Sequence, residues 1–153
     1  MKKQILILFS LILSLAAFAQ KGGNWEAKIK EIQEYKIQYL IQEMDLPSDK
    51  QAEFTRLYTA YDNARTALFR SFMQQDKAMK AKENPSEADY AEAAQAMATA
   101  KLREGELENS YYLQFKQMLT PKQLYNMKRA ENRFEHKLRE AHQGQRKTKK
   151  GKK

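Results

Sequence analysis

The chain has 153 residues, no Cys, three Pro, five Gly and a formal net charge of +9. The lack of Cys excludes disulfides, thiolate metal sites and thiol catalysis. So few Pro and Gly, beside abundant Ala, Glu, Lys, Gln, Leu and Met, favour long helices over a sheet. We therefore expect an all-α protein with one modest domain.

The first 19 residues have the three regions of a secretory signal peptide. A positive start, Met-Lys-Lys, precedes an apolar run from Ile5 to Leu15, and Ala17-Phe18-Ala19 supplies small residues where a signal peptidase reads. The alternative is an uncleaved membrane anchor. That alternative fits less well, because the run has about 11 residues and a bilayer core needs roughly 20. We expect cleavage after Ala19 and export into the cell envelope.

The positive charge is concentrated at the C-terminus. Loss of Lys2 and Lys3 with the signal peptide leaves +7, and residues 144–153 carry six positive charges and no acid, so residues 20–143 carry only +1. We expect a helical domain over residues 20–143 and a disordered basic tail over residues 144–153. The tail is either a solvated end or a weak contact for anionic lipid head groups or acidic protein segments. Nucleic acid is not an expected partner of a near-neutral, exported domain.

Four helices are predicted from the spacing of apolar residues and from the residues that interrupt it. Two of them end before Pro47 and Pro85, because the residue before a proline is disfavoured in the helical region. The second helix, with about 34 residues, would be near 50 Å long, which exceeds a compact domain of this size. We expect an elongated bundle in which a second chain covers part of that helix. The four helices are expected over about Trp25–Met44, Asp49 to the low eighties, Glu87–Met118 and Pro121–His142.

Two of the helix starts share a capping pattern. In each, a Ser or Thr is placed as the N-cap and a Gln follows three residues later as its reciprocal partner. A Leu precedes the cap by one or two residues. The third helix has Ser86 as its expected N-cap. The residues of the two shared patterns are Leu46, Ser48 and Gln51 before the second helix and Leu119, Thr120 and Gln123 before the fourth.

This pair of patterns in an exported helical chain resembles the LTxxQ family of periplasmic proteins, which includes Spy and CpxP. LTPKQ at residues 119–123 matches the family motif in full, whereas LPSDKQ at residues 46–51 has a Pro inserted after the Leu and Ser in place of Thr. The stretch from Met44 to Phe54 is also similar to Spy-like proteins of the Bacteroidetes type. The resemblance covers most of residues 25–142.

The resemblance implies an antiparallel homodimer shaped as a curved cradle. It implies an ATP-independent periplasmic chaperone, without a cofactor, that binds unfolded or misfolded envelope proteins under stress. Members similar to CpxP instead restrain a membrane-bound stress sensor, so a regulatory protein is the alternative. A zinc-responsive branch uses Cys- and His-rich segments, but this chain has only His136 and His142, which fall on nearly opposite helix faces. No metal site is therefore expected.

The candidate client-binding residues lie beside the main apolar stripes. Phe69 and Met73 are four apart on one flank of the second helix, Arg56 and Arg70 lie near that flank, and Tyr112 is placed similarly on the third helix. The alternative is that the aromatic and Met residues fill the core or a dimer interface. Flexible Met side chains adapt to varied partners, and six remain after Met1 is lost: Met44, Met73, Met79, Met97, Met118 and Met127.

The sequence contains no motif that indicates an enzyme. It contains no Gly-rich phosphate loop, no His-Glu-x-x-His and no Glu-x-x-His of the kind used in di-iron bundles. Acidic residues alternate with Lys and Arg, as on a solvated helix surface. We therefore expect a binding protein without catalytic residues, and a purely structural helical protein is the third hypothesis.

Overall fold

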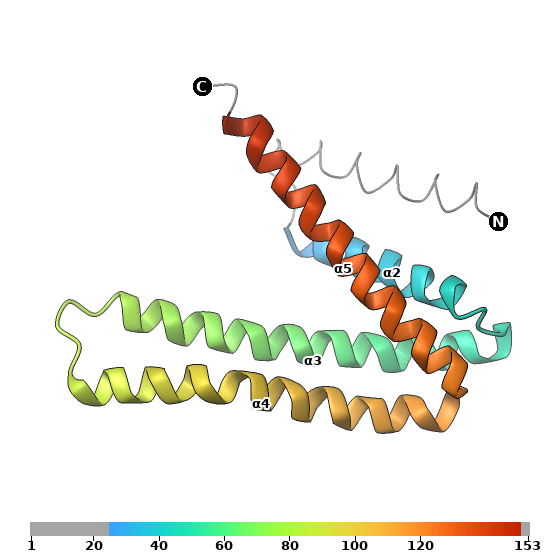
Figure 1. The fold of residues 1–153 in the computed structure, drawn as a ribbon, viewed down its shortest axis with the longest axis horizontal. Helices are drawn as coiled ribbons and strands as arrows, with labels where there is room; N and C mark the ends of the chain where they lie inside the picture. The colour runs from blue at the N-terminus through green and yellow to red at the C-terminus, as the bar shows by residue number, and fades with distance from the viewer. Residues whose placement is uncertain (1–24, 151–153) are drawn as a thin grey trace. The chain divides into compact units, whose positions relative to one another are not determined.

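The computed structural model describes residues 25–150, and over that range it contains four α-helices and no strand (Figure 1). This confirms the predicted all-α fold. The predicted signal peptide, residues 1–19, lies outside the described residues. Within the part described, no helix combines the length and the hydropathy that crossing a bilayer requires. The helices are α2 (Trp25–Glu43), α3 (Ser48–Lys80), α4 (Glu87–Met118) and α5 (Pro121–Lys150).

The helix bounds follow the predicted breaks closely, except at the end of α5. The sequence predicts that this helix ends near His142 and that a disordered tail follows, but α5 continues to Lys150. Residues 144–150 therefore continue α5 in the structure, and residues 151–153 lie outside the described range. This segment has one Gly and no Pro, its other residues are mostly good helix formers, and positive charge at a helix C-terminus is favourable.

The described chain divides into two compact units, which are considered separately. One contains α2 and α5 from Tyr125 onward, and the other is the segment Met44–Leu124. The second unit is a helical hairpin, in which α3 and α4 run antiparallel side by side and are joined by residues 81–86 (Figure 1). Since α3 has 33 residues, the hairpin is about 50 Å long.

In the unit formed by α2 and α5, aromatic and charged side chains hold the two helices together. The rings of Tyr35 and Tyr39 each lie 6.0 Å from the ring of Phe134, measured between centroids. The Arg133 Nε donates a hydrogen bond to the Tyr39 hydroxyl at 3.3 Å, and its Nη2 pairs with Glu43. The hydrogen bond to Tyr39 raises the pKa of the Arg133 guanidinium.

One end of the hairpin is closed by an aromatic cluster. Phe54, Tyr58 and Phe115 are almost fully buried, with ring centroids 5.5 to 6.1 Å apart. Tyr61 extends the cluster and its hydroxyl donates to the Glu108 carboxylate at 3.1 Å. Such ring pairs contribute about 0.5–1.5 kcal/mol each beyond the burial of their area. We call this end, residues 44–61 and 115–124, the closed half.

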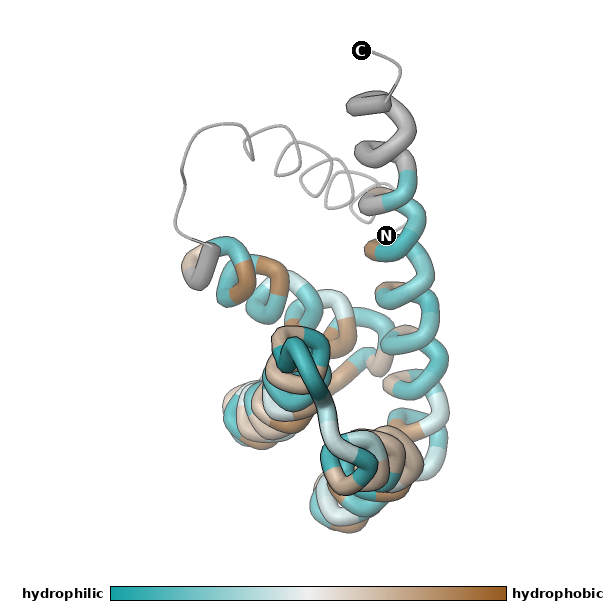
Figure 2. The backbone as a smooth tube through the Cα atoms, turned by 90° about the vertical axis from the view of Figure 1, so that its left-hand side faces the viewer, coloured by the Kyte–Doolittle hydropathy of each residue, from teal (hydrophilic) through white to brown (hydrophobic). Residues whose placement is uncertain are grey.

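The rest of the hairpin, residues 62–114, contains no buried residue, and we call it the open half. Leu68 and Phe72 continue the predicted α3 stripe, but both are only half-buried. Figure 2, which looks along the hairpin from its tip, shows hydrophobic positions mixed with hydrophilic ones around both helices. Two helices alone cannot enclose the side chains between them, so the apolar residues here keep much of their area in water.

The two predicted capping boxes differ in outcome. At the start of α5 the Thr120 Oγ1 accepts a hydrogen bond from the Gln123 backbone N–H at 3.3 Å, and the Gln123 Oε1 accepts from the Thr120 N–H at 3.0 Å, as predicted. Ser48 is instead the first helical residue of α3, makes no capping hydrogen bond, and follows Pro47 at the cap position. The prediction for Ser48 is wrong, because Pro47 already adopts the extended ψ of 147° that an N-cap needs. Gln51 donates to the Leu46 carbonyl at 2.9 Å.

We predict that Thr120→Ala and Ser48→Ala differ in their effect on stability. Loss of the Thr120 cap should lower the free energy of unfolding by about 1 kcal/mol. Ser48→Ala removes an exposed hydroxyl without a capping role, and should change it by less than about 0.5 kcal/mol. Urea unfolding followed by circular dichroism measures both. Equal losses from the two substitutions would contradict the assignment of the caps.

Candidate functional site

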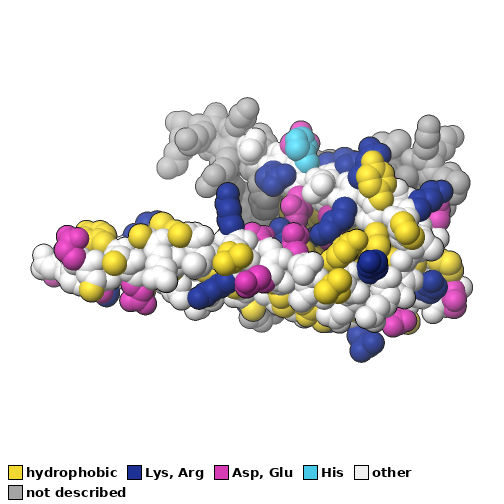
Figure 3. Space-filling view, turned by 60° about the horizontal axis from the view of Figure 1, so that its bottom comes forward, with side chains coloured by type: hydrophobic (Ala, Val, Ile, Leu, Met, Phe, Trp, Pro, Cys, Tyr) yellow, Lys and Arg dark blue, Asp and Glu magenta, His cyan; other side chains and the backbone are white. Residues whose placement is uncertain are grey.

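The open half exposes large apolar side chains on both of its helices. Phe69 and Met73 on α3, and Met97 and Leu102 on α4, are all more than half exposed. Figure 3 shows hydrophobic side chains in patches along the hairpin, between charged ones. Exposed apolar patches on a soluble protein often mark an interaction surface. Three further α4 side chains are exposed in the same half: Tyr90, Tyr112 and Leu113.

On the outer flank of α3, the exposed apolar side chains lie beside cations. Phe69 and Met73 are one helical turn apart and line a shallow hollow with Arg70 and Lys77. The Nζ of Lys80, on the same hollow, is held 2.6 Å from the Asp76 carboxylate. The side chains of Arg70 and Lys77, in contrast, form no ion pair with any other described residue. This flank therefore combines an apolar strip with two positive charges available to a partner.

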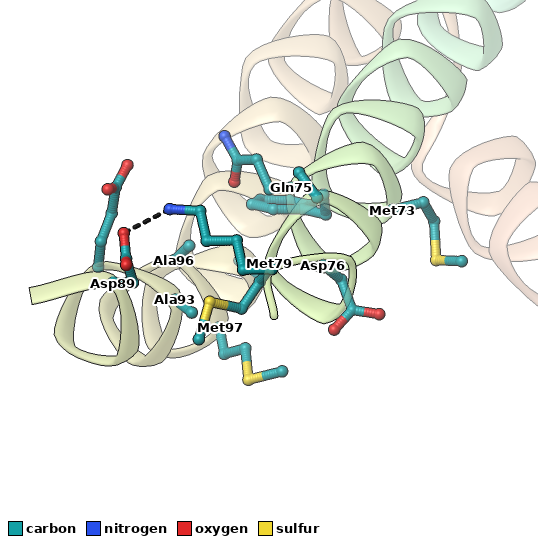
Figure 4. Close-up of a pocket in the computed structure, with 13 residues that line it drawn as sticks. Met73, Gln75, Asp76, Met79, Asp89, Ala93, Ala96 and Met97 are labelled. Atoms are coloured by element: carbon teal, nitrogen blue, oxygen red, sulfur yellow. Dashed lines mark hydrogen bonds and ion pairs between the residues drawn. The ribbon is translucent and has the colours of Figure 1, made fainter. Parts of the chain in front are cut away.

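A second hollow is a groove of about 350 Å³ between α3 and α4. Its floor is apolar: Phe72, Met73 and Met79 contribute from α3, and Met97 contributes from α4 (Figure 4). The groove exists because the facing α4 positions are small residues, which leave space that longer side chains would fill. These small residues are Ala93, Ala96 and Ala100.

The two helices of the open half have opposite charge. Residues 62–80 of α3 contain four positive residues and two acids, whereas residues 87–114 of α4 contain two positive residues and six acids. One pair joins the helices, since the Arg65 Nε lies 3.5 Å from the Glu104 carboxylate. A flexible segment of either charge can therefore find a complementary flank beside the same apolar groove.

The structure brings together three of the five predicted client-binding residues. Phe69, Arg70 and Met73 line one hollow in the open half. Arg56 lies in the closed half, where it lines a polar hollow together with residues from the C-terminal end of α4. Tyr112 is exposed on α4 but lines none of the hollows that contain Phe69. Because Phe69, Met73 and Tyr112 are exposed, they are not part of the core of this chain.

The sequence reasoning included Tyr112 of α4 but missed Met97 and Leu102 on that helix, and it missed the basic end of α3. Met97 and Leu102 are more exposed than Met73, and Lys77 lies on the same hollow as Phe69. The signal for Lys77 was available, because it lies four residues after Met73 and therefore on the same face. Met97 had no comparable signal, since the surrounding Ala-rich sequence defines no apolar stripe from which an outer face can be read.

At the tip of the hairpin, Asp89 fixes the start of α4. Its carboxylate accepts hydrogen bonds from the Lys82 Nζ at 2.5 Å and from the Ser86 backbone N–H at 2.8 Å, and the Ser86 Oγ caps the Asp89 N–H. The bond from Lys82, followed by those from Ser86, lowers the pKa of Asp89 from its ordinary 3.8 to about 2. The N-cap predicted at Ser86 is confirmed, and Asp89 is its partner in the box.

Neither a metal site nor a relative guides the assignment of function. Among residues 25–150, no group of three or more His, Cys, Asp or Glu side chains is placed to hold a metal ion. Scans against protein-family models, curated proteins and solved structures found no match to this chain. The chemistry of the open half is therefore the feature of the described residues that bears on function.

We predict that Asp89 titrates near pH 2 in the folded protein. Because its pKa is lowered on folding, its stabilising contribution is complete above pH 3.8 and is lost as the pH falls towards 2. The carboxyl carbon chemical shift, followed by NMR, measures the midpoint. Lys82→Met should move it towards 3.8, since Lys82 is the largest cause of the shift.

Lys101→Met provides the matched control for this titration. It removes a lysine from α4 about 18 Å along the helix from Asp89, and should leave the midpoint unchanged. A wild-type midpoint close to 3.8 would show that the network around Asp89 does not form.

Proposed function

We propose that this chain is an ATP-independent chaperone of the cell envelope, which holds unfolded proteins against the open half of its α3–α4 hairpin. The single observation that carries the proposal is that residues 62–114 include no buried residue, although they display Phe69, Met73, Met97 and Leu102. Exposure of these apolar side chains to water costs free energy. Contact with the apolar side chains of an unfolded segment is favourable, at about 25 cal/mol for each Å² removed from water.

The chemistry of the surface suits weak binding of many partners. Met side chains are flexible and adapt to varied shapes. Arg70 and Lys77 lie beside Phe69 and Met73 without ion pairs to the other described side chains, so they favour segments that combine apolar and acidic residues. The acidic flank of α4 favours basic segments, which widens the range of clients.

Export and assembly complete the proposal. The predicted signal peptide supports a periplasmic location, where nucleotide is not supplied, and the LTxxQ resemblance supports a homodimer. A client surface on the open half requires that the dimer forms through other surfaces. A regulator of a membrane-bound sensor, the alternative that the resemblance implies, would bind one folded partner and would not need to suppress aggregation.

We predict that the mature protein suppresses aggregation of two unrelated unfolded clients at stoichiometric concentration, without ATP. Phe69→Ser with Met73→Ser should weaken holding roughly tenfold or more, because loss of about 1.4 kcal/mol of apolar contact corresponds to a factor of ten. Light scattering of the clients on dilution from denaturant measures the effect. Helicity should stay unchanged, since both side chains are exposed.

Tyr125→Ser is the matched control, because Tyr125 is 61% exposed, close to the 64% of Phe69, but lies on α5 outside the open half. It should leave holding close to wild type. Failure of the wild type to protect either client would overturn the chaperone proposal. Sedimentation of the double variant adds a second check: conversion of a dimer to a monomer would show that Phe69 and Met73 form the dimer interface and are not free for clients.

A further inference from the structure

The six Met residues that follow the predicted signal peptide differ sharply in exposure. Met44 and Met127 are 3% and 1% exposed, whereas Met73 and Met97 are 52% and 67% exposed. Met79 and Met118 lie between these limits, and Met118 belongs to the closed half. Because the chain has no Cys, Met is its only sulfur that an oxidant can reach.

The three accessible Met residues of the open half line one groove. Met73 and Met79 come from α3 and Met97 comes from α4. Figure 4 shows the side chains of Met79 and Met97 close together on one side of the groove, with Met73 on the other flank of α3. Ala93 and Ala96 line the groove from α4 beside Met97, so the α4 side of the groove next to Met79 carries small side chains.

We propose that Met73, Met79 and Met97 form an oxidation site that switches off the client surface. A two-electron oxidant, such as hydrogen peroxide, transfers one oxygen atom to the thioether: an S–O bond forms, the O–O bond breaks and water leaves. Hypochlorous acid delivers the same oxygen and leaves chloride and a proton. The sulfur is oxidised by two electrons, the oxidant is reduced by two, and the product is methionine sulfoxide.

The consequence follows from the polarity of the sulfoxide. Its S=O group binds water strongly, so covering it with an apolar client segment removes hydration without an exchange for new hydrogen bonds. Three of the four side chains that form the apolar floor of the groove then become polar, whereas the aromatic cluster of the closed half contains no Met. This inference rests on the proposed chaperone function. Sulfoxide reductases restore the thioether, which makes the switch reversible.

The first arm of the test uses no client. The full mature protein is treated with limiting hydrogen peroxide, and peptide mass spectrometry follows each Met with time. Met73 and Met97 should oxidise first and Met79 next, with Met44 and Met127 at least tenfold slower. In urea the order should disappear, because burial alone sets it. Oxidation of Met44 or Met127 as fast as that of Met97 in the folded protein would overturn the site.

The second arm compares client holding by each protein with its own holding before treatment. Oxidation should weaken holding by the wild type at least tenfold, and the Met44→Leu, Met127→Leu control should lose as much. The Met73→Leu, Met79→Leu, Met97→Leu variant, which lacks the three sulfurs of the groove but keeps Met118, should keep its own starting value. Unchanged holding by wild type oxidised at all three positions would overturn the switch and leave the chaperone proposal standing. If untreated protein holds no client, the chaperone proposal fails. The first arm uses no client, so it tests the order of oxidation independently of that result.

Discussion

The packing of the tilted rings of Phe54, Tyr58 and Phe115 is the interaction on which the rest of the hairpin depends. A pair of antiparallel helices has no third layer, so it can bury side chains only where large rings from both helices fill the space between them. That condition is met in the closed half, where these rings lose nearly all contact with water. Towards the tip of the hairpin the facing α4 positions include Ala93, Ala96 and Ala100, and no residue of the range 62–114 is buried. The buried aromatic side chains of the hairpin are thus confined to one of its ends.

This division connects stability with the proposed function. The closed half provides a rigid base, and the capping network of Ser86 and Asp89 stabilises the start of α4 at the far end. Between them lies a stretch of helix whose apolar side chains do not contribute to a core and so remain free to bind. A chaperone needs such a surface but must also stay folded while it is exposed. Placement of the stabilising contacts at the two ends of the hairpin satisfies both requirements.

Local signals predicted the fold well, and the site only in part. The helix bounds were predictable from the proline positions and from the capping box at Thr120. Both signals act on the backbone of adjacent residues and so can be read from the sequence. Ser48 is not the N-cap of α3. The N-cap is the residue with the extended backbone, and in the structure that residue is Pro47. Phe69 and Met73 were found from their offset beside a clear stripe on α3. Met97 was not found, since in an Ala-rich helix the exposed face is decided by packing with the other helix.

The proposed function requires that clients bind the open half of the hairpin. The methionines report on this binding, because they are distributed over both halves and over α5. With methyl-labelled Met and a soluble, permanently unfolded client, we expect that the NMR signals of Met73, Met79 and Met97 shift or broaden, while those of Met44 and Met127 stay in place. Changes centred on Met44 or Met127, or no change at a client concentration that saturates binding, would contradict it.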